Sequence, residues 1–144
     1  MSRSVSRSVT VAAPPAEVFD LLADPRRHAE IDGSGTVKGR IRGPERLSDG
    51  ARFGMRMHYL VPYVITNTVV EFEPGRRIAW RHFGHHVWRY ELAPTGDGGT
   101  VVTETFDYAP ARSPKVLELA RIPAKNAESI EKTLSRLQQV LGGT

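Results

Sequence analysis

Three consecutive runs of alternating side chains between Arg76 and Tyr108 constrain the fold of this chain more than any other stretch. Two turn signals separate the runs, Phe83-Gly84-His85 and a glycine-rich segment at 95–99. Alternation places every second side chain on one face of a strand, and short turns join antiparallel neighbours. The pattern predicts a meander whose inward face carries Ile78, Trp80, His82, His86, Trp88, Tyr90, Leu92, Val102, Glu104, Phe106 and Tyr108.

The two turns also predict the register of these strands. Directly opposed residues of an antiparallel pair share a face, so a turn must keep the parity of its strands. A three-residue loop at 83–85 places His82 opposite His86. Further expected pairs are Trp80 with Trp88, Ile78 with Tyr90, Leu92 with Val102, Tyr90 with Glu104 and Trp88 with Phe106. Buried histidines and carboxylates need partners, so this face is either a wet pocket or a core with a satisfied polar network.

Four more strands are expected upstream, at Ser4–Ala12, Thr36–Arg42, Ala51–Tyr59 and Tyr63–Glu73. Two short helices separate the first two. One begins at Pro15, and the other has Asp24 as its N-cap and Pro25 in its first turn. A turn near Val61-Pro62 that pairs Tyr59 with Val64 directs Val64, Thr66, Thr68, Val70 and Phe72 inward.

The period becomes helical after Pro110. Pro123 interrupts the pattern and predicts a short leading helix or a kink, followed by a long helix from about Ala124 to Leu141. Its apolar stripe comprises Val116, Ala120, Ala127, Ile130, Leu134, Leu137 and Leu141. Only the inward face of the sheet can bury this stripe. The expected class is α+β, with seven antiparallel strands wrapped around the long C-terminal helix in one domain.

Composition excludes several classes of protein. The 144 residues include no cysteine, so disulfides and thiolate metal sites are ruled out. The N-terminus lacks an apolar core of signal-peptide length, and no apolar run reaches the ~18 residues of a membrane span. We expect a cytoplasmic protein without stable membrane insertion, either monomer or homodimer. The net charge of +4 is spread over the strands, so nucleic acid is not an expected partner.

Three stretches carry a resemblance to a known family. They are VTVAAPPAEVFDLLADP at 9–25, VVEFEPGRRIAW at 69–80, and YELAP at 90–94 followed by GTVV at 99–102. Together with the order of elements, they resemble the START-like superfamily of polyketide cyclases/dehydrases and lipid-transport proteins. The resemblance implies a helix-grip fold with an elongated apolar cavity between sheet and helix. Members bind lipids, polyketides, quinones or hormones, and some catalyse cyclisation or dehydration. No family catalytic motif transfers residue by residue.

The candidate proton carriers are His82, His86, Tyr90 and Glu104, which share the inward face. The alternative is a buried polar network in which Glu104 accepts a hydrogen bond from Tyr90. His85 sits in the turn and points elsewhere, so the histidines do not predict a metal, and no cofactor is expected. His28, Glu30 and Asp32 fall near a helix end, either at a cavity mouth or as solvated capping residues.

The leading hypothesis is binding of a hydrophobic small molecule, a lipid, polyketide or aromatic ligand. The first alternative is a cyclase/dehydrase-type enzyme. The second is an interaction module that uses a basic outer face formed by Lys38, Arg40, Arg42, Arg52 and Arg56. The expected ligand-binding residues are Phe53, Met55, Met57, Tyr59, Thr68, Val70, Trp80, His82, His86, Trp88, Tyr90, Phe106 and Leu134.

Overall fold

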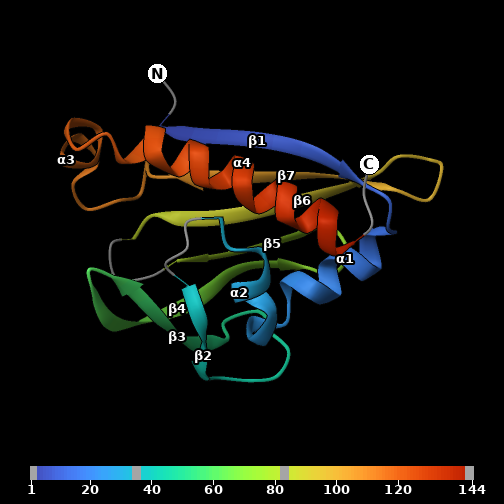
Figure 1. Ribbon diagram of the computed structural model, residues 1–144, viewed down its shortest axis with the longest axis horizontal. Helices are drawn as coiled ribbons and strands as arrows, with labels where there is room; N and C mark the ends of the chain where they lie inside the picture. The colour runs from blue at the N-terminus through green and yellow to red at the C-terminus, as the bar shows by residue number, and fades with distance from the viewer. Residues whose placement is uncertain (1–2, 34–36, 82–84, 142–144) are drawn as a thin grey trace.

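A single antiparallel sheet forms the body of the molecule, with strand order β1-β7-β6-β5-β4-β3-β2 (Figure 1). The computed structural model describes residues 3–33, 37–81 and 85–141, without the side chains at 37, 39–42 and 59. The strands are β1 (Ser4–Val11), β2 (Val37–Arg42), β3 (Arg52–Tyr59), β4 (Val61–Glu73), β5 (Arg77–Arg81), β6 (Val87–Pro94) and β7 (Thr100–Asp107). The helices are α1 (Pro15–Leu22), α2 (His28–Ile31), α3 (Pro114–Leu119) and α4 (Ile122–Val140), and a 3₁₀ turn at Pro25–Arg27 precedes α2.

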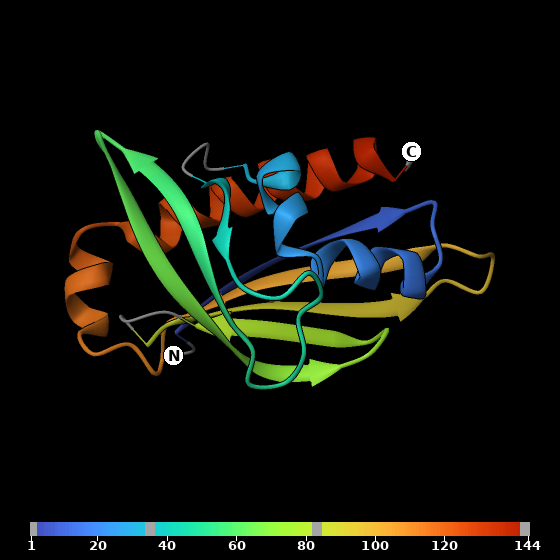
Figure 2. The ribbon, with the colours of Figure 1, turned by 90° about the horizontal axis from the view of Figure 1, so that it is seen from below.

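The sheet curls around α4, as the two ribbon views show (Figures 1 and 2). Helices α1 and α2 follow β1 and lie on the same side of the sheet as α4. The predicted α+β class, the antiparallel sheet and the long C-terminal helix are therefore confirmed.

The predicted registers of the last three strands are confirmed where the structure describes them. Trp80 lies opposite Trp88, and Tyr90 lies opposite Glu104. The other confirmed pairs are Ile78 with Tyr90, Leu92 with Val102 and Trp88 with Phe106. The predicted His82–His86 pair lies outside the described residues, and the last described pair beside that turn is Arg81 with Val87.

The predicted register between β3 and β4 is wrong. Tyr59 lies opposite Val61 rather than Val64, because Leu60 alone makes the turn with a left-handed backbone, φ 64°. This tighter turn changes the parity of β4 and reverses its faces. Tyr63, Ile65, Asn67 and Val69 take the inward face, whereas Val64, Thr66, Thr68 and Val70 face outward.

A register shift between Val69 and Glu71 restores the predicted parity at the end of β4. Phe72 lies opposite Ile78 and faces inward, the orientation that the sequence predicts for it. Its ring meets the edge of Phe19 from α1, with centroids 5.3 Å apart. The bulge thus lets one strand line an open region at one end and pack in the core at the other.

Helix starts follow the predicted capping signals. Asp24 accepts a hydrogen bond from the backbone N–H of Arg26 at 3.0 Å, and Pro25 occupies the first turn. The buried residues of α1 are Val18, Phe19, Leu21 and Leu22. The second predicted helix consists of the 3₁₀ turn followed directly by α2. Its residues His28 and Ile31 are buried and face the inward side of the sheet.

The C-terminal helical region divides into two helices and has no kink at Pro123. Arg121 adopts a left-handed conformation, φ 60°, which separates α3 from α4. Pro123 falls in the first turn of α4, where its missing N–H leaves no intrahelical bond unmade. Val116 and Ala120 are exposed on or beside α3, so their assignment to the buried stripe is wrong. Ala127, Ile130, Leu134 and Leu137 of α4 are buried as predicted.

Helix α4 packs mainly on β1 and β7, at one edge of the sheet. Its buried side chains meet a core that includes Val11, Val102 and Phe106. The inward face of β3, β4 and β5 continues beyond the reach of the helix. This part of the sheet is therefore left to line a cavity.

Replacement of Leu134 by Ala should lower the free energy of unfolding by about 2–5 kcal/mol, because Leu134 is fully enclosed and the cavity left behind refills only partly. Urea unfolding monitored by circular dichroism measures the loss. Val140→Ala on the exposed side of the same helix is the matched control and should cost far less. Equal losses for the two variants would contradict the placement of α4 against the sheet.

Candidate functional site

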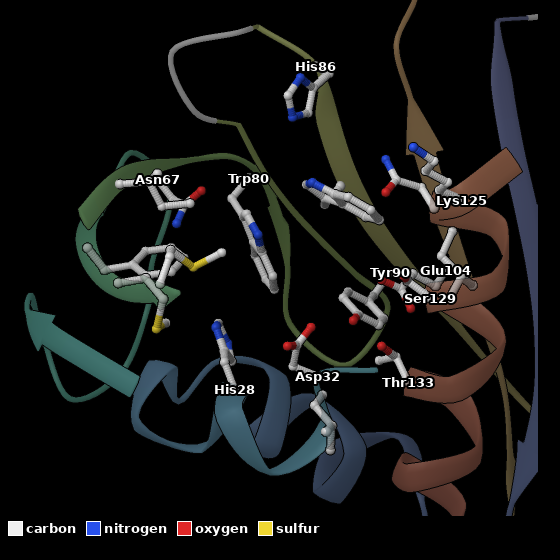
Figure 3. Close-up of a pocket in the computed structure, with 18 of the residues that line it drawn as sticks. His28, Asp32, Asn67, Trp80, His86, Tyr90, Glu104, Lys125, Ser129 and Thr133 are labelled. Carbon is white, nitrogen blue, oxygen red and sulfur yellow. The ribbon is translucent and has the colours of Figure 1, made fainter. Parts of the chain in front are cut away.

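A cavity of about 530 Å³ lies between the concave face of the sheet and helices α2 and α4 (Figure 3). One wall is aromatic and sulfur-rich, and the opposite end carries polar groups. The lining residues are His28, Ile31, Asp32, Phe53, Met55, Met57, Tyr63, Ile65, Asn67, Trp80, His86, Trp88, Tyr90, Glu104, Ile122, Lys125, Asn126, Ser129, Ile130 and Thr133.

Trp80 is the centre of the aromatic wall. The His28 ring stacks on it with centroids 4.8 Å apart and planes 19° apart. Phe53 meets Trp80 edge-on at 5.7 Å. Met55 and Met57 continue this wall along β3, and both are buried. Flat rings and flexible thioethers together suit an apolar ligand of irregular outline.

His28 is a fixed and neutral part of this wall. Its Nε2 lies 2.9 Å from the carbonyl oxygen of Leu22, which can only accept, so Nε2 carries the proton. Burial lowers the pKa of the imidazole, although this hydrogen bond partly opposes the effect. Nδ1 therefore holds a free electron pair at neutral pH and can accept a hydrogen bond.

Glu104 is the central polar group of the other end. Its β7 position sets it directly opposite Tyr90 of β6, and the two side chains are hydrogen-bonded. Burial raises the pKa of Glu104 to about 8; the Tyr90 hydrogen bond opposes this rise, and the nearby Asp32 carboxylate adds to it. At neutral pH the Glu104 carboxyl thus keeps its proton. Its Oε1 is buried without a hydrogen-bond partner among the described residues.

Helix α4 supplies a row of polar side chains to the same cavity. Lys125, Ser129 and Thr133 are spaced four residues apart, so they lie on one helix face. Figure 3 shows Ser129 and Thr133 near Tyr90 and Glu104, with Lys125 one turn further along. The Thr133 hydroxyl accepts a hydrogen bond from the backbone N–H of Gly33 at 2.8 Å.

Gly33 lets the turn after α2 approach α4 closely. A Cβ atom on Gly33 would stand 2.4 Å from the carbonyl oxygen of Ser129 and 2.5 Å from the backbone nitrogen of Thr133. Only glycine fits that contact. The contact fixes the position of neighbouring Asp32, which faces the Tyr90–Glu104 pair across the cavity (Figure 3).

His86 lines the cavity beyond the aromatic wall, apart from the Tyr90–Glu104 pair (Figure 3). Its ring meets Phe106 at 5.2 Å, and partial burial lowers the pKa of the imidazole. His85 does not line the cavity; its Nε2 lies 3.1 Å from an Arg112 guanidinium nitrogen and accepts from it. Within the described ranges, no three His, Asp or Glu side chains converge as metal ligands.

Several residues predicted to bind ligand line the cavity: Phe53, Met55, Met57, Trp80, His86, Trp88 and Tyr90. Phe106 and Leu134 are instead buried in the core behind it. Thr68 and Val70 are on the outward side of β4, so their assignment to the cavity is wrong; the misjudged β3–β4 turn is the reason. His82 and the side chain of Tyr59 lie outside the described parts of the chain.

Sequence reasoning missed part of the lining. Tyr63, Ile65 and Asn67 were assigned to the wrong face of β4 by the same register error. The four-residue spacing of Lys125, Ser129 and Thr133 was a readable signal of a polar face beside the apolar stripe. His28 and Asp32 line the cavity, whereas Glu30 pairs with Arg27 at 2.9 Å on the surface.

Known proteins resemble this chain over almost its whole length. The model of a family described as "Polyketide cyclase / dehydrase and lipid transport" matches residues 2–142. An uncharacterized protein of Mycobacterium tuberculosis strain H37Rv is 45% identical over 138 residues, which cover 92% of this chain and 62% of that protein. A protein of strain CDC 1551 is 44% identical with the same coverage, so the chain spans about three fifths of the length of these relatives.

Solved structures share the fold at lower identity. A Rhodobacter sphaeroides protein has a TM-score of 0.74 and 19% identity, covering 99% of this chain and 93% of that one. A Polyketide_cyc-like protein of Corynebacterium glutamicum has a TM-score of 0.65 and 24% identity, again covering 99% and 93%. None of the helices described here is long and apolar enough to cross a membrane.

The buried Glu104 carboxyl predicts a specific pH dependence of stability. Its pKa is about 8 in the folded protein and near the ordinary value of 4.5 when unfolded. The unfolded chain therefore loses this proton first as pH rises. Glu104 should contribute its full stability below pH 4.5, and this should fall by up to about 1.4 kcal/mol per pH unit until about pH 8.

Glu104→Gln removes this titration while keeping the shape. The variant should match the wild type near pH 4.5 and be the more stable protein at pH 8.5, in urea unfolding at a series of pH values. Burial lowers the pKa of His28, so its contribution to the free energy of unfolding rises with pH, opposite to that of Glu104. Both proteins retain His28, so this contribution cancels when the variant is compared with the wild type. Glu128→Gln on the exposed face of α4 is the control and should follow the wild-type curve. Parallel curves for Glu104→Gln would show that the carboxyl is ionised at neutral pH.

Proposed function

The chain belongs to the polyketide cyclase/dehydrase and lipid transport family, and on that premise we propose that it binds a hydrophobic small molecule between the sheet and α4. The observation that carries this proposal is the cavity itself. Its volume of about 530 Å³ falls within the range of ligand sites, roughly 300–1,000 Å³. An aromatic wall faces a small group of convergent polar side chains, which is the usual composition of such sites.

The arrangement of the walls favours a ligand with a flat or branched apolar body. Trp80 and Phe53 contribute aromatic surface to the cavity, and Met57 contributes a flexible thioether. A planar ring stacked beside Trp80 would bury apolar area without displacing a charged group. The body of the ligand would then point its far end at the Tyr90–Glu104 pair.

The polar end favours a neutral oxygen on the ligand. A protonated Glu104 can donate to a carbonyl or hydroxyl oxygen, and the Ser129 hydroxyl lies on the adjacent face of α4. A ligand carboxylate would be disfavoured there, because the Asp32 carboxylate faces the same space. We therefore propose a keto- or hydroxyl-bearing lipid, polyketide or aromatic compound as the ligand class.

Native mass spectrometry of the protein purified from its own source should reveal a retained small molecule of this class. Apolar fluorescent probes should bind the empty protein and raise its melting temperature, because a ligand that binds only the folded state stabilises it. A protein that neither retains a molecule nor gains stability from any apolar probe would contradict the proposal.

Met57→Trp should fill the cavity and abolish probe binding while the protein stays folded. Met57 is buried on the cavity wall, so the larger side chain takes the volume a ligand would occupy. The measurements are probe fluorescence titration and circular dichroism. The matched control is Val70→Trp on the outward face of β4, which should bind the probe as the wild type does. Unchanged affinity in Met57→Trp would place the ligand elsewhere.

A second candidate function is dehydration or cyclisation of a keto substrate. The observation that favours it is the protonated Glu104 beside Tyr90 at the enclosed end of the cavity. As a general acid, Glu104 would give its proton to the departing hydroxyl of a β-hydroxyketone, so that water leaves. The Asp32 carboxylate, which faces the Tyr90–Glu104 pair, would take the α-proton as the base, and the new C=C bond would form from the C–H electron pair.

Glu104→Gln separates the two functions. In an enzyme, the variant should lose turnover of a ring-containing β-hydroxyketone by at least 100-fold, the usual contribution of a general acid, while substrate affinity stays close to wild type. Product formation is followed by mass spectrometry, and Glu128→Gln is again the control. Wild-type protein that binds such compounds but converts none of them would leave binding as the function.

The interaction-module alternative has less support. Lys38, Arg52 and Arg56 are exposed as predicted, whereas the side chains of Arg40 and Arg42 lie outside the described set. A protein that uses only its outer face has no need of an unfilled interior. The open cavity therefore favours ligand binding over this alternative.

A further inference from the structure

The tip of the β3–β4 hairpin exposes apolar side chains at an energetic cost. Leu60 is 87% exposed and Val61 is 61% exposed. Leu60 also adopts a left-handed backbone conformation, φ 64°, which glycine or asparagine would adopt with less strain. Neither cost is offset by a contact of Leu60 within the described core. A polar residue such as asparagine at position 60 would make this turn more stable than leucine does.

Helix α3 exposes a second apolar group at the same end of the molecule. None of its six residues, all of which the structure describes, is buried; Leu119 is 84% exposed and Val116 is 61% exposed. The hairpin tip, in green, and α3, in orange, project at one end of the molecule, while the last turn of α4 is at the other (Figure 2).

The mouth of the cavity lies between these two projections. Met57 and Tyr63, which form a pair near the hairpin tip, line the cavity from one side. Ile122 and Asn126 line it from the other side, at the start of α4 directly after α3. The exposed side chains of Tyr63 and Lys125 belong to this lining, so the cavity reaches the surface between the hairpin tip and α3.

Positive charge accompanies the exposed apolar side chains. Arg56 on the hairpin and Lys115, Arg121 and Lys125 around α3 are all exposed. Within the described parts of the chain, no ion pair joins any of these four to an acidic side chain. The acid in α3, Glu118, is 3.5 Å from Arg3 and accepts a hydrogen bond from Tyr108. The end of the molecule around the mouth is therefore cationic.

We propose that the hairpin tip and α3 form a docking surface for an anionic lipid bilayer. Docking brings the mouth of the cavity against the acyl chains of the lipids. Apolar side chains that project from a cationic surface match the layered chemistry of a bilayer, with anionic headgroups outside and hydrocarbon beneath. The two projections stand apart with the mouth between them, so a fluid surface accommodates them better than one flat protein face. The docking is peripheral and reversible.

Sedimentation with vesicles tests this directly. Wild-type protein should bind vesicles of phosphatidylcholine mixed with phosphatidylglycerol and show little binding to phosphatidylcholine alone. High salt should weaken the binding, because it screens charges at the membrane surface. Absence of binding to the anionic vesicles, or equal binding to both types, would overturn the proposal.

Leu60→Asn removes the apolar tip and suits the left-handed turn, so the fold is retained. It should weaken vesicle binding about tenfold, the scale of one buried Leu side chain. The matched control is Val140→Asn, an exposed residue at the opposite end of the molecule, which should bind like the wild type. Equal binding by Leu60→Asn and the wild type would overturn the role of the hairpin.

Lys115→Gln combined with Arg56→Gln should weaken binding by about fivefold per charge removed. Arg76→Gln combined with Lys132→Gln removes the same charge away from the mouth and should have little effect. Equal losses would mean that net charge alone drives the binding, and would overturn the assignment of the docking surface to the hairpin tip and α3. A concentration-dependent dimer in sedimentation velocity that Leu60→Asn abolishes would identify a second copy of the chain as the partner, and would also overturn the proposal.

Membrane docking and ligand binding in the cavity can be tested independently, by measuring vesicle binding and probe binding on the same variant. Leu60→Asn should bind an apolar probe in solution as the wild type does, because Leu60 does not line the cavity. Loss of vesicle binding with probe binding intact supports a separate docking surface. Simultaneous loss of both in a folded variant would show that Leu60 shapes the cavity, and would overturn the assignment of Leu60 to docking.

Discussion

One helix lies across a sheet that is too wide for it to cover. Helix α4 packs on β1 and β7, where Leu134 and Leu137 close the core. The inward face of β3 to β5 extends past the helix and has to be covered by α2 and by its own curvature. Coverage is incomplete, so the protein retains an interior space between the sheet and the helix. The cavity and the exposure of its aromatic wall follow from this mismatch between one helix and one sheet.

The boundary between core and cavity is where polar groups are buried. Tyr90 and Glu104 pair across β6 and β7 at the line where α4 stops packing tightly. A charged carboxylate there would lose its hydration, which is why Glu104 keeps its proton. Gly33 brings the turn after α2 against α4 from the other side. The site is therefore held in place by the pairing of β6 with β7 and by the contact of Gly33 with α4. Tyr90, Glu104 and Asp32 are positioned by these two contacts.

The sequence predicted the parts of the fold that depend on local alternation and short glycine-rich turns. The pairs of Trp80 with Trp88 and Tyr90 with Glu104 followed from parity alone. The β3–β4 register did not, because Leu60 occupies a left-handed turn position without the glycine or asparagine that usually signals one. His28 reached the cavity through stacking on Trp80, a tertiary contact that no local pattern contains. The polar row from Lys125 to Thr133 was visible as helical spacing beside the apolar stripe.

The bulge between Val69 and Glu71 divides β4 into two segments of opposite parity. Residues after it, such as Phe72, pack against α1, and residues before it, such as Ile65 and Asn67, face the cavity. A substitution in the outer segment therefore alters the cavity without disturbing the packing of α1. Substitutions on the hairpin can therefore reshape the cavity while the contacts of α1 that stabilise the fold are kept. A chain of this kind can vary the shape of its interior at little risk to its own foldability.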